Sequence, residues 1–183
     1  MEEDIGKYFV AIIPPEPIYQ QAAELKNYFK DRYHSKGALH SPPHITLHMP
    51  FQWKRKKEAG LVEKLETFVS GQRSHTVVLK DFGCFAPRVI FMNVMPNDVL
   101  PRLQKDLQWF CRTELGLLNS LYKDLPFHPH LTLAFRDLKK PAFAEAWKEF
   151  EHKEYTAQFV ADRIALLRHT GKVWGVLESF RMA

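Results

Sequence analysis

Two short stretches of the chain decide the fold: residues 43–47, Pro-His-Ile-Thr-Leu, and residues 129–133, Pro-His-Leu-Thr-Leu. In a β-strand, side chains two positions apart point to the same face of the sheet. The His and Thr of each stretch therefore share one face, while the aliphatic residues point to the other face, into a core. With this composition, one His-apolar-Thr-apolar match is expected by chance fewer than about 0.1 times. The two matches predict a pair of related strands that line one surface.

The same order of elements surrounds both stretches. An apolar strand ending at Pro14 precedes the first motif histidine by 30 positions, and one ending at Pro96 precedes the second by 34. Apolar residues at helical spacing follow each of these strands. The sequence thus predicts a twofold duplication of a strand–helix–strand–helix unit. Further helices are expected near residues 61–69 and 141–150, and further strands near 76–85, 159–167 and 173–180, the last two joined by a turn at 170–171.

Composition excludes several classes of protein. The 183 residues are 45% hydrophobic and 26% charged, with 12 Pro and 8 Gly, which is ordinary for a globular chain. No apolar run reaches the roughly 18 residues of a membrane span, and the acidic start lacks the features of a signal peptide. Two cysteines are too few for a disulfide framework or a CxxC zinc site. We expect a soluble, cytoplasmic monomer in which residues 1–183 form a single domain of two closely packed lobes.

The charge and the missing motifs narrow the function only in part. A formal net charge of +5 suits an anionic partner such as a nucleotide or RNA. A small basic enzyme with no nucleic-acid role would carry the same charge, so both interpretations stay open. The chain contains no GxGxxG, GxxxxGK[ST] or GxSxG pattern. Dinucleotide-binding, P-loop and serine-hydrolase interpretations are therefore excluded.

The duplicated His/Thr pairs suit the hydrolysis of a phosphodiester. An imidazole has an unperturbed pKa of about 6.5, so one neutral histidine can take a proton from water while a charged one protonates a departing ribose oxygen. Threonine hydroxyls can donate hydrogen bonds to the non-bridging phosphate oxygens and stabilise charge that develops there. The candidate catalytic residues are His44, Thr46, His130 and Thr132. The sequence leaves open which histidine is the acid and which is the base.

These features resemble the 2H phosphoesterase superfamily, which includes 2′,3′-cyclic phosphodiesterases and bacterial 2′-5′ RNA ligase-like proteins. The resemblance covers essentially the whole chain and rests on residues 9–13, 44–47, 89–94 and 130–135, which occur in the expected order. It implies an α+β, bilobal, pseudo-twofold fold, in which two antiparallel sheets form a central groove and the helices lie outside. It also implies that the two His/Thr pairs face each other across the groove, with no metal or other cofactor.

The activity that the resemblance implies is the hydrolysis of a 2′,3′-cyclic phosphate, at a nucleotide or RNA end, to a 2′-phosphate. Two alternatives stay open: a nucleotide- or RNA-binding module with little turnover, and 2′-5′ RNA ligation, the reversible opening of a cyclic phosphate by a 5′-hydroxyl. Many relatives continue past the first motif with a Phe-Leu-Gly-like segment, whereas residues 48–51 here are His-Met-Pro-Phe. The substrate therefore stays open between mononucleotides, RNA ends and cyclic oligonucleotides.

Strand parity adds two candidate substrate contacts. If its strand continues, His48 would point to the same face as the first His/Thr pair. Arg136 would likewise share the face of the second pair, where a guanidinium would suit a phosphate. The competing interpretation places both residues on the surface. His128 and His130 form a His-x-His fragment, but no Cys, Asp or Glu stands at a recognisable spacing, so no metal site is predicted.

Aromatic and basic residues near the motifs are further candidates for contacts with RNA. Phe51, Trp53 and Phe127 could each stack a base, and Arg55 belongs to a basic run at 54–57 that could follow a phosphate backbone. The competing interpretations are a core position for Phe127 and a solvated loop for the basic run.

Overall fold

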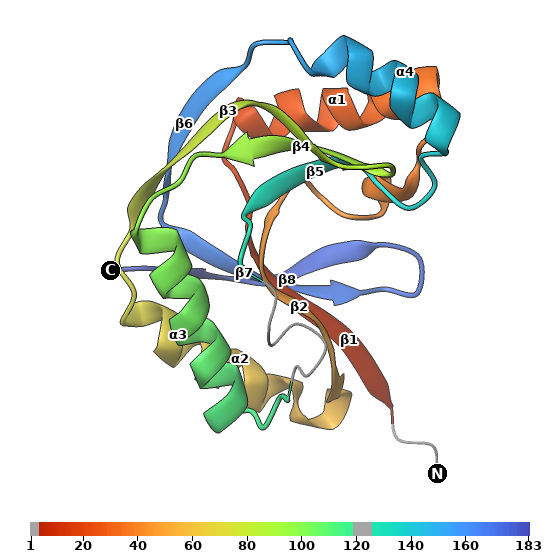
Figure 1. Ribbon diagram of the computed structural model, residues 1–183. Coiled ribbons are helices and arrows are strands. Elements are labelled where there is room, and N and C mark those ends of the chain that lie inside the picture. Colours follow the sequence, from red (N-terminus) through yellow and green to blue (C-terminus); the bar gives the residue numbers. More distant parts are fainter. Residues whose placement is uncertain (1–3, 119–125) are drawn as a thin grey trace.

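The computed structural model describes residues 4–118 and 126–183, and Figure 1 shows their arrangement. None of the helices in these two ranges is long and apolar enough to cross a membrane. The described residues form eight strands, four α-helices and two short 3₁₀-helices, which confirms the α+β class. In chain order they are β1 (Ile5–Ile12), α1 (Ile18–Tyr33), η1 (Gly37–His40), β2 (Ile45–Lys54), η2 (Arg55–Lys57), α2 (Glu58–Ser70), β3 (His75–Phe85), β4 (Val89–Val94), α3 (Val99–Thr113), β5 (His130–Ala134), α4 (Lys140–Phe150), β6 (Thr156–Ala161), β7 (Arg163–His169) and β8 (Trp174–Arg181).

The strands form one antiparallel sheet in the order β6-β3-β4-β5-β2-β1-β7-β8, so the expectation of two separate sheets is wrong. The two four-stranded halves meet at β2 and β5, the strands that carry the His/Thr motifs. They are joined there through one residue pair, Ile45 opposite Leu131. The inner edges of the halves would otherwise expose unpaired backbone groups, and pairing them with each other satisfies part of that requirement. We call this line of contact the seam.

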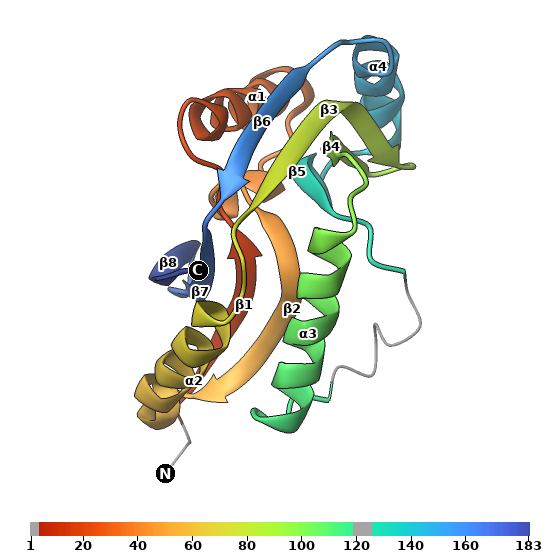
Figure 2. The same ribbon diagram turned by 90° about the vertical axis from the view of Figure 1, so that its left-hand side faces the viewer.

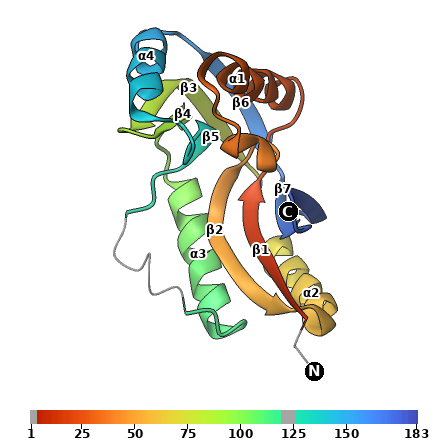
Figure 3. The same cartoon turned by 90° about the vertical axis from the view of Figure 1, so that its right-hand side faces the viewer.

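The four inner strands are symmetric about the seam, with β4 beside β5 and β1 beside β2, but the helices cross it. Helix α1 follows β1 yet contacts β5, and α3 follows β4 yet contacts β2. Figures 1, 2 and 3 show α1 beside α4 at one end of the molecule and α2 and α3 together at the other. Rings of Phe29 and Phe150 lie 4.9 Å apart in the first group, and those of Phe68 and Phe110 lie 4.8 Å apart in the second. Each half therefore supplies a helix to the other half's motif strand.

Two hydrophobic clusters distinguish the faces of the sheet. The larger one joins the buried sides of all four helices to one face, and we call it the main core. The smaller one contains no helical residue and lies on the opposite face, which we call the site face. Its buried members are Phe9, Ala11, Ala165 and Leu167. The aliphatic residues of both motifs belong to the main core and are at most 2% exposed, as the alternation predicts: Ile45, Leu47, Leu131 and Leu133.

The closing strands differ from the sequence prediction in one respect. The single strand expected over 159–167 is divided at Asp162 into β6 and β7. These two strands lie in different halves of the sheet, beside β3 and β1 respectively, so the chain must change direction between them. The expected turn between β7 and β8 is present, and Gly171 adopts a φ of 99° there, a conformation that glycine tolerates best.

We predict that Leu131→Ala destabilises the protein by about 2–5 kcal/mol, because it leaves a cavity where the two halves meet. The Leu131 side chain is fully buried in the main core beside the seam. Urea unfolding followed by circular dichroism measures the change. Leu118→Ala is the matched control, since Leu118 is 77% exposed and its loss should change stability by less than about 0.5 kcal/mol. Equal effects of the two substitutions would contradict this account of the seam.

Candidate functional site

Both motif histidines are anchored in the same way by the backbone before them. Nδ1 of His44 lies 2.8 Å from the carbonyl oxygen of Pro42, and Nδ1 of His130 lies 2.7 Å from that of His128. A carbonyl can only accept a hydrogen bond, so Nδ1 carries the proton and Nε2 holds the free lone pair of the neutral ring. The proline between each histidine and its acceptor residue restricts that residue to extended backbone, which fixes the direction of the carbonyl.

A phenylalanine packs against each of these imidazole rings. The ring of Phe9 in β1 is 4.9 Å from that of His44, at 50°, and the ring of Phe91 in β4 is 4.8 Å from that of His130, at 47°. The two histidines are thus held by equivalent contacts in the two halves. Sequence reasoning missed both phenylalanines, although each stands five residues before the proline that ends its strand. That shared spacing is a signal that could have found them.

The motif threonines lie on the site face. Thr46 pairs with Ala11 of the site-face cluster, and Thr132 pairs with Phe91, whose ring packs on the second motif histidine. Both threonines are partly exposed, as are both histidines. Each hydroxyl therefore lies in the same surface as its own histidine.

The seam brings the two motifs together. Because Ile45 lies opposite Leu131 in antiparallel register, the first histidine stands next to the second threonine across the seam, and the second histidine stands next to the first threonine. Paired strands are separated by about 4.8 Å. The four candidate catalytic side chains therefore gather around the seam from two strands that are 86 positions apart in the sequence. Two imidazoles and two hydroxyls therefore share one surface beside the seam.

Both motif histidines are poised to be neutral. Burial lowers the pKa of His44 to about 4, against the opposing effect of the Pro42 hydrogen bond, and the charges of Lys26 and His130 add to the lowering. Burial also lowers the pKa of His130, which the hydrogen bond to His128 opposes and the charge of His128 reinforces. The effect of His130 on His44 follows from their shared position, since two charged imidazoles would repel each other. A bound anion would reverse this balance.

An aromatic group borders the second histidine. The ring of Phe85, which is 41% exposed, meets the ring of His130 edge-on at 5.1 Å and that of His128 at the same distance. Phe85 ends β3, so this group stands at one side of the site. Exposed ring faces and edges of this kind are surfaces on which a nucleobase can pack.

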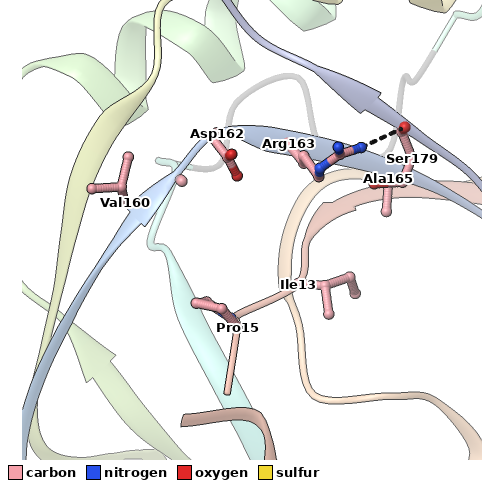
Figure 4. Close-up of a pocket in the computed structure, with 8 residues that line it drawn as sticks. Ile13, Pro15, Val160, Asp162, Arg163, Ala165 and Ser179 are labelled. Carbon is pink, nitrogen blue, oxygen red and sulfur yellow. Dashed lines mark hydrogen bonds between the residues drawn. The ribbon is translucent and has the colours of Figure 1, made fainter. Parts of the chain in front are cut away.

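A hollow of about 260 Å³ is lined by residues of β6, β7 and β8 and by the segment after β1 (Figure 4). Thr46 pairs with Ala11, and Ala11 pairs with Ala165, which places Ala165 in the hollow about 10 Å from Thr46, two strand spacings away. The guanidinium of Arg163 hydrogen-bonds the carbonyl oxygen of Ser179 at 3.4 Å. The lining residues are Ile13, Pro15, Val160, Ala161, Asp162, Arg163, Ala165 and Ser179.

The strand parity expected for His48 is interrupted by a bulge. Thr46 pairs with Ala11, whereas His48 pairs with Val10, so Leu47 is an extra residue in β2. A bulge of this kind sets two consecutive side chains opposite one residue of the partner strand. His48 therefore turns away from the motif threonine, and it is only 4% exposed.

The aromatic and basic contacts predicted after the first motif lie toward the far end of β2, and the aromatic contact predicted before the second motif packs against the main core. Phe51, Trp53 and Phe127 are partly buried and pack against the main core. Arg55 forms an ion pair with Asp4 at 3.0 Å. At roughly 3.3 Å per residue, the end of β2 that carries Phe51 and Trp53 is about 15 Å or more from the seam.

Arg136 lies beyond the end of β5, so the prediction that it shares the face of the second His/Thr pair does not apply. β5 ends at Ala134, and Arg136 adopts a left-handed φ of 61°. Its guanidinium carbon stands 5.0 Å from the centre of the Phe135 ring. Within residues 4–118 and 126–183, no group of three His, Cys, Asp or Glu side chains is placed to hold a metal ion.

Comparison with known proteins agrees with this architecture. A crystal structure of the Thermus thermophilus protein TT0787 superposes with a TM-score of 0.70 and 20% identity, covering 96% of this chain and 97% of that one. Escherichia coli LigT in complex with 3′-AMP superposes with a TM-score of 0.69 and 20% identity, covering 98% and 99%. The curved eight-stranded sheet with helices outside is therefore the fold of these proteins.

Sequence comparison gives the family. A candidate phosphoesterase of Geobacillus kaustophilus is 29% identical over 180 residues, covering 95% of each chain. One of Bacillus licheniformis is 26% identical over 180 residues, covering 95% of this chain and 97% of that one. The 2′-5′ RNA ligase superfamily profile matches residues 14–173. The chain belongs to this superfamily, which confirms the resemblance drawn from the two motifs.

We predict that both motif histidines titrate below pH 6.5 in the folded protein, with His44 near pH 4, because burial disfavours the charged ring. Two-dimensional ¹H–¹⁵N spectra of the imidazoles, recorded from pH 3.5 to 8, give both pKa values. The urea-unfolded chain is the control, and its histidines should return to about 6.5. A folded-state pKa of 6.5 or higher for His44 would show that its ring is not buried as described.

Proposed function

We propose that this protein is a metal-independent phosphodiesterase that hydrolyses a 2′,3′-cyclic phosphate, at a nucleotide or RNA end, to a 2′-phosphate. The observation that carries the proposal is the pair of imidazoles at the seam. Each is fixed through Nδ1, so that Nε2 is the nitrogen available for proton transfer. Two such groups of opposite protonation supply both proton transfers of a hydrolysis. The catalytic residues that we propose are His44, Thr46, His130 and Thr132.

In the proposed reaction, Nε2 of the neutral histidine takes a proton from water as the water oxygen bonds to phosphorus. The bond from phosphorus to the ribose O3′ breaks, and Nε2 of the protonated histidine gives its proton to that oxygen. The products are a 2′-phosphate and a free 3′-hydroxyl. The two histidines have then exchanged protonation states, so a proton must pass between them or through solvent before the next cycle.

The threonines and the flanking surfaces would position the substrate. The hydroxyls of Thr46 and Thr132 donate to the two non-bridging phosphate oxygens, and they stabilise the charge that grows there in the transition state. The ribose and base then extend to one side of the phosphate, toward either the hollow of Figure 4 or the aromatic group around Phe85. Positioning by these surfaces supplies the part of the rate enhancement that proton transfer does not.

The relatives support a nucleotide substrate. The Geobacillus and Bacillus proteins are named for phosphoesterase activity, and Escherichia coli LigT has been crystallised with 3′-AMP and with phosphate. Each of these ligands contains a phosphate group, as the proposed substrate does. We extend the proposal to a monomer that acts in the cytoplasm on RNA ends or free nucleotides.

Ligation is the second candidate, and the name of the superfamily favours testing it. A 5′-hydroxyl that replaces water in the attack would form a 2′-5′ linkage with the same two histidines, because one must deprotonate the attacking hydroxyl and the other must protonate the departing O3′. Dilute RNA ends compete poorly with abundant water, so hydrolysis should dominate. Product analysis on RNA that carries both ends separates the two reactions.

We predict that the protein converts a 2′,3′-cyclic nucleotide or a cyclic-ended RNA to the 2′-phosphate in the presence of EDTA. His44→Ala and His130→Ala should each lower kcat about 10²–10⁴-fold, since each removes one proton transfer. Thr46→Val and Thr132→Val should each lower kcat about tenfold or more, because each removes one hydrogen bond to the phosphate. Chromatography of the products against 2′- and 3′-phosphate standards gives the rates and the regiochemistry.

His152→Ala is the matched control, because this histidine is on the surface and lies outside the site. It should leave kcat and KM unchanged. Turnover that survives both motif substitutions would refute the mechanism, and so would activity that requires added metal. Tight nucleotide binding without turnover across mononucleotides, RNA ends and cyclic oligonucleotides would favour the binding-module alternative instead.

The pH dependence follows from the lowered pKa values of both histidines. One histidine must be protonated as the acid, and both lose their protons below pH 6.5 in the free enzyme. We predict that kcat/KM is greatest below pH 6.5 and falls about tenfold per pH unit above the pKa of the acid. The bound phosphate anion raises both pKa values, so the decline in kcat should begin at higher pH than the decline in kcat/KM. A kcat/KM that still rises from pH 7 to 8 would exclude a histidine acid.

A further inference from the structure

A carboxylate beyond the second motif holds the loop that leads to the first. Asp137 follows β5, and its side chain accepts hydrogen bonds from the Ser35 hydroxyl at 2.8 Å, the Lys36 N–H at 2.6 Å and the Gly37 N–H at 3.0 Å. Ser35 is fully buried. The approach is close enough that a Cβ added at Gly37 would lie 3.1 Å from the carboxylate oxygen Oδ1. The loop is therefore fitted to this one acidic side chain.

The backbone before Asp137 is bent to aim it at the loop. The Asp137 N–H donates to the carbonyl oxygen of Phe135 at 2.7 Å, and Arg136 between them has a φ of 61°. A non-glycine residue pays a conformational cost in this region, and such residues persist where the surrounding structure requires the geometry. The turn after the second motif thus has a specific task, which is the contact with residues 35–37.

A buried lysine fixes the remainder of the same loop. Nζ of Lys26, on α1, donates to the carbonyl oxygens of Ala38 and Ser41, both at 3.0 Å, and the side chain is 2% exposed. Burial lowers the pKa of Lys26 to about 7, so a neutral amine that still donates these bonds is readily populated near neutral pH. Lys26 and Asp137 hold residues 35–41 from opposite ends.

This loop ends at the acceptor for the first catalytic candidate. The residue after Ser41 is Pro42, whose carbonyl oxygen accepts the hydrogen bond from Nδ1 of His44. The second histidine has no such dependence on the loop, since its acceptor is the carbonyl of His128 just before β5. The orientation of one imidazole is therefore set by a side chain attached to the strand of the other.

We propose that Asp137 is a positioning residue: through the loop at 35–42 it sets the orientation of His44 relative to His130, which stands on Asp137's own side of the seam. The kinetic part of this inference rests on the proposed function, and the structural part does not. Displacement of a catalytic group by about 1 Å can lower a rate about 10²-fold, which is the scale of effect expected here.

The chemistry of the contact makes asparagine a discriminating substitution. Two backbone N–H groups converge on the Oδ2 atom of Asp137, and a hydroxyl meets Oδ1. An asparagine can turn its amide oxygen to the two N–H groups and donate from its amide nitrogen to the Ser35 hydroxyl. Asp137→Asn should therefore keep the loop in place, while Asp137→Ala leaves two backbone N–H groups without their acceptor.

The experiment combines imidazole ¹⁵N spectra of the ligand-free protein with steady-state kinetics. In the wild type, His44 should show the Nδ1–H tautomer. In Asp137→Ala we expect the His44 signals to shift toward a mixture of tautomers while those of His130 stay in place, and kcat to fall about 10- to 100-fold with KM changing less than threefold. Asp137→Asn should restore both readouts to within about threefold of the wild type.

Lys26→Met tests the other end of the loop and should disturb His44 in the same direction. Asp31→Ala is the matched control, since Asp31 forms an exposed ion pair with Lys30 on α1, and it should change neither readout. Unchanged His44 signals in a folded Asp137→Ala protein would overturn the inference, as would equal shifts of His44 and His130. If the wild type fails to turn over cyclic phosphates, the spectra still decide the structural claim, so the two failures are distinguishable.

Discussion

The hydrogen bond from each motif imidazole to the backbone two residues before it is the constraint on which the site depends. It fixes the tautomer, directs Nε2 away from the chain, and ties each ring to the extended backbone that a proline imposes. A phenylalanine on the neighbouring strand then holds each ring at nearly the same angle. Two histidines anchored in this manner become a single site only because their strands meet, and the chain achieves this with one paired position, Ile45 with Leu131.

Much of this arrangement follows from local patterns. The alternation in residues 43–47 and 129–133 predicts which side chains enter the core, and the described residues bear this out with aliphatic positions that are at most 2% exposed. The repeated element order agrees with the inner four strands, β4-β5-β2-β1, which are arranged symmetrically about the seam. The joining of two expected sheets into one was not predictable, because it depends on which strand edges meet across the seam, and neither motif contains that information. The division of the strand near Asp162 has the same cause, since it reflects the passage of the chain between halves.

Predictions that assumed strand parity beyond the motifs were the least successful. A single extra residue in β2 turns His48 away from Thr46. The left-handed backbone at Arg136 interrupts the alternation of faces that β5 would otherwise continue. A period-two pattern carries no sign of a bulge, because the bulge arises from the twist and pairing of neighbouring strands. The sequence pattern also does not predict contacts with backbone carbonyls. The same holds for the contact of Asp137 with a loop about 100 positions earlier. They depend on three-dimensional approach rather than on residue spacing.

The exchange of helices across the seam also bears on the independence of the two halves. Because α1 lies against β5 and α3 against β2, a single strand–helix–strand–helix unit would leave its motif strand without the helix that covers it. Each half therefore completes the hydrophobic covering of the other, and separating them would expose apolar surface on both. Neither half is a self-contained folding unit, and the whole chain has to assemble before either motif is held in place.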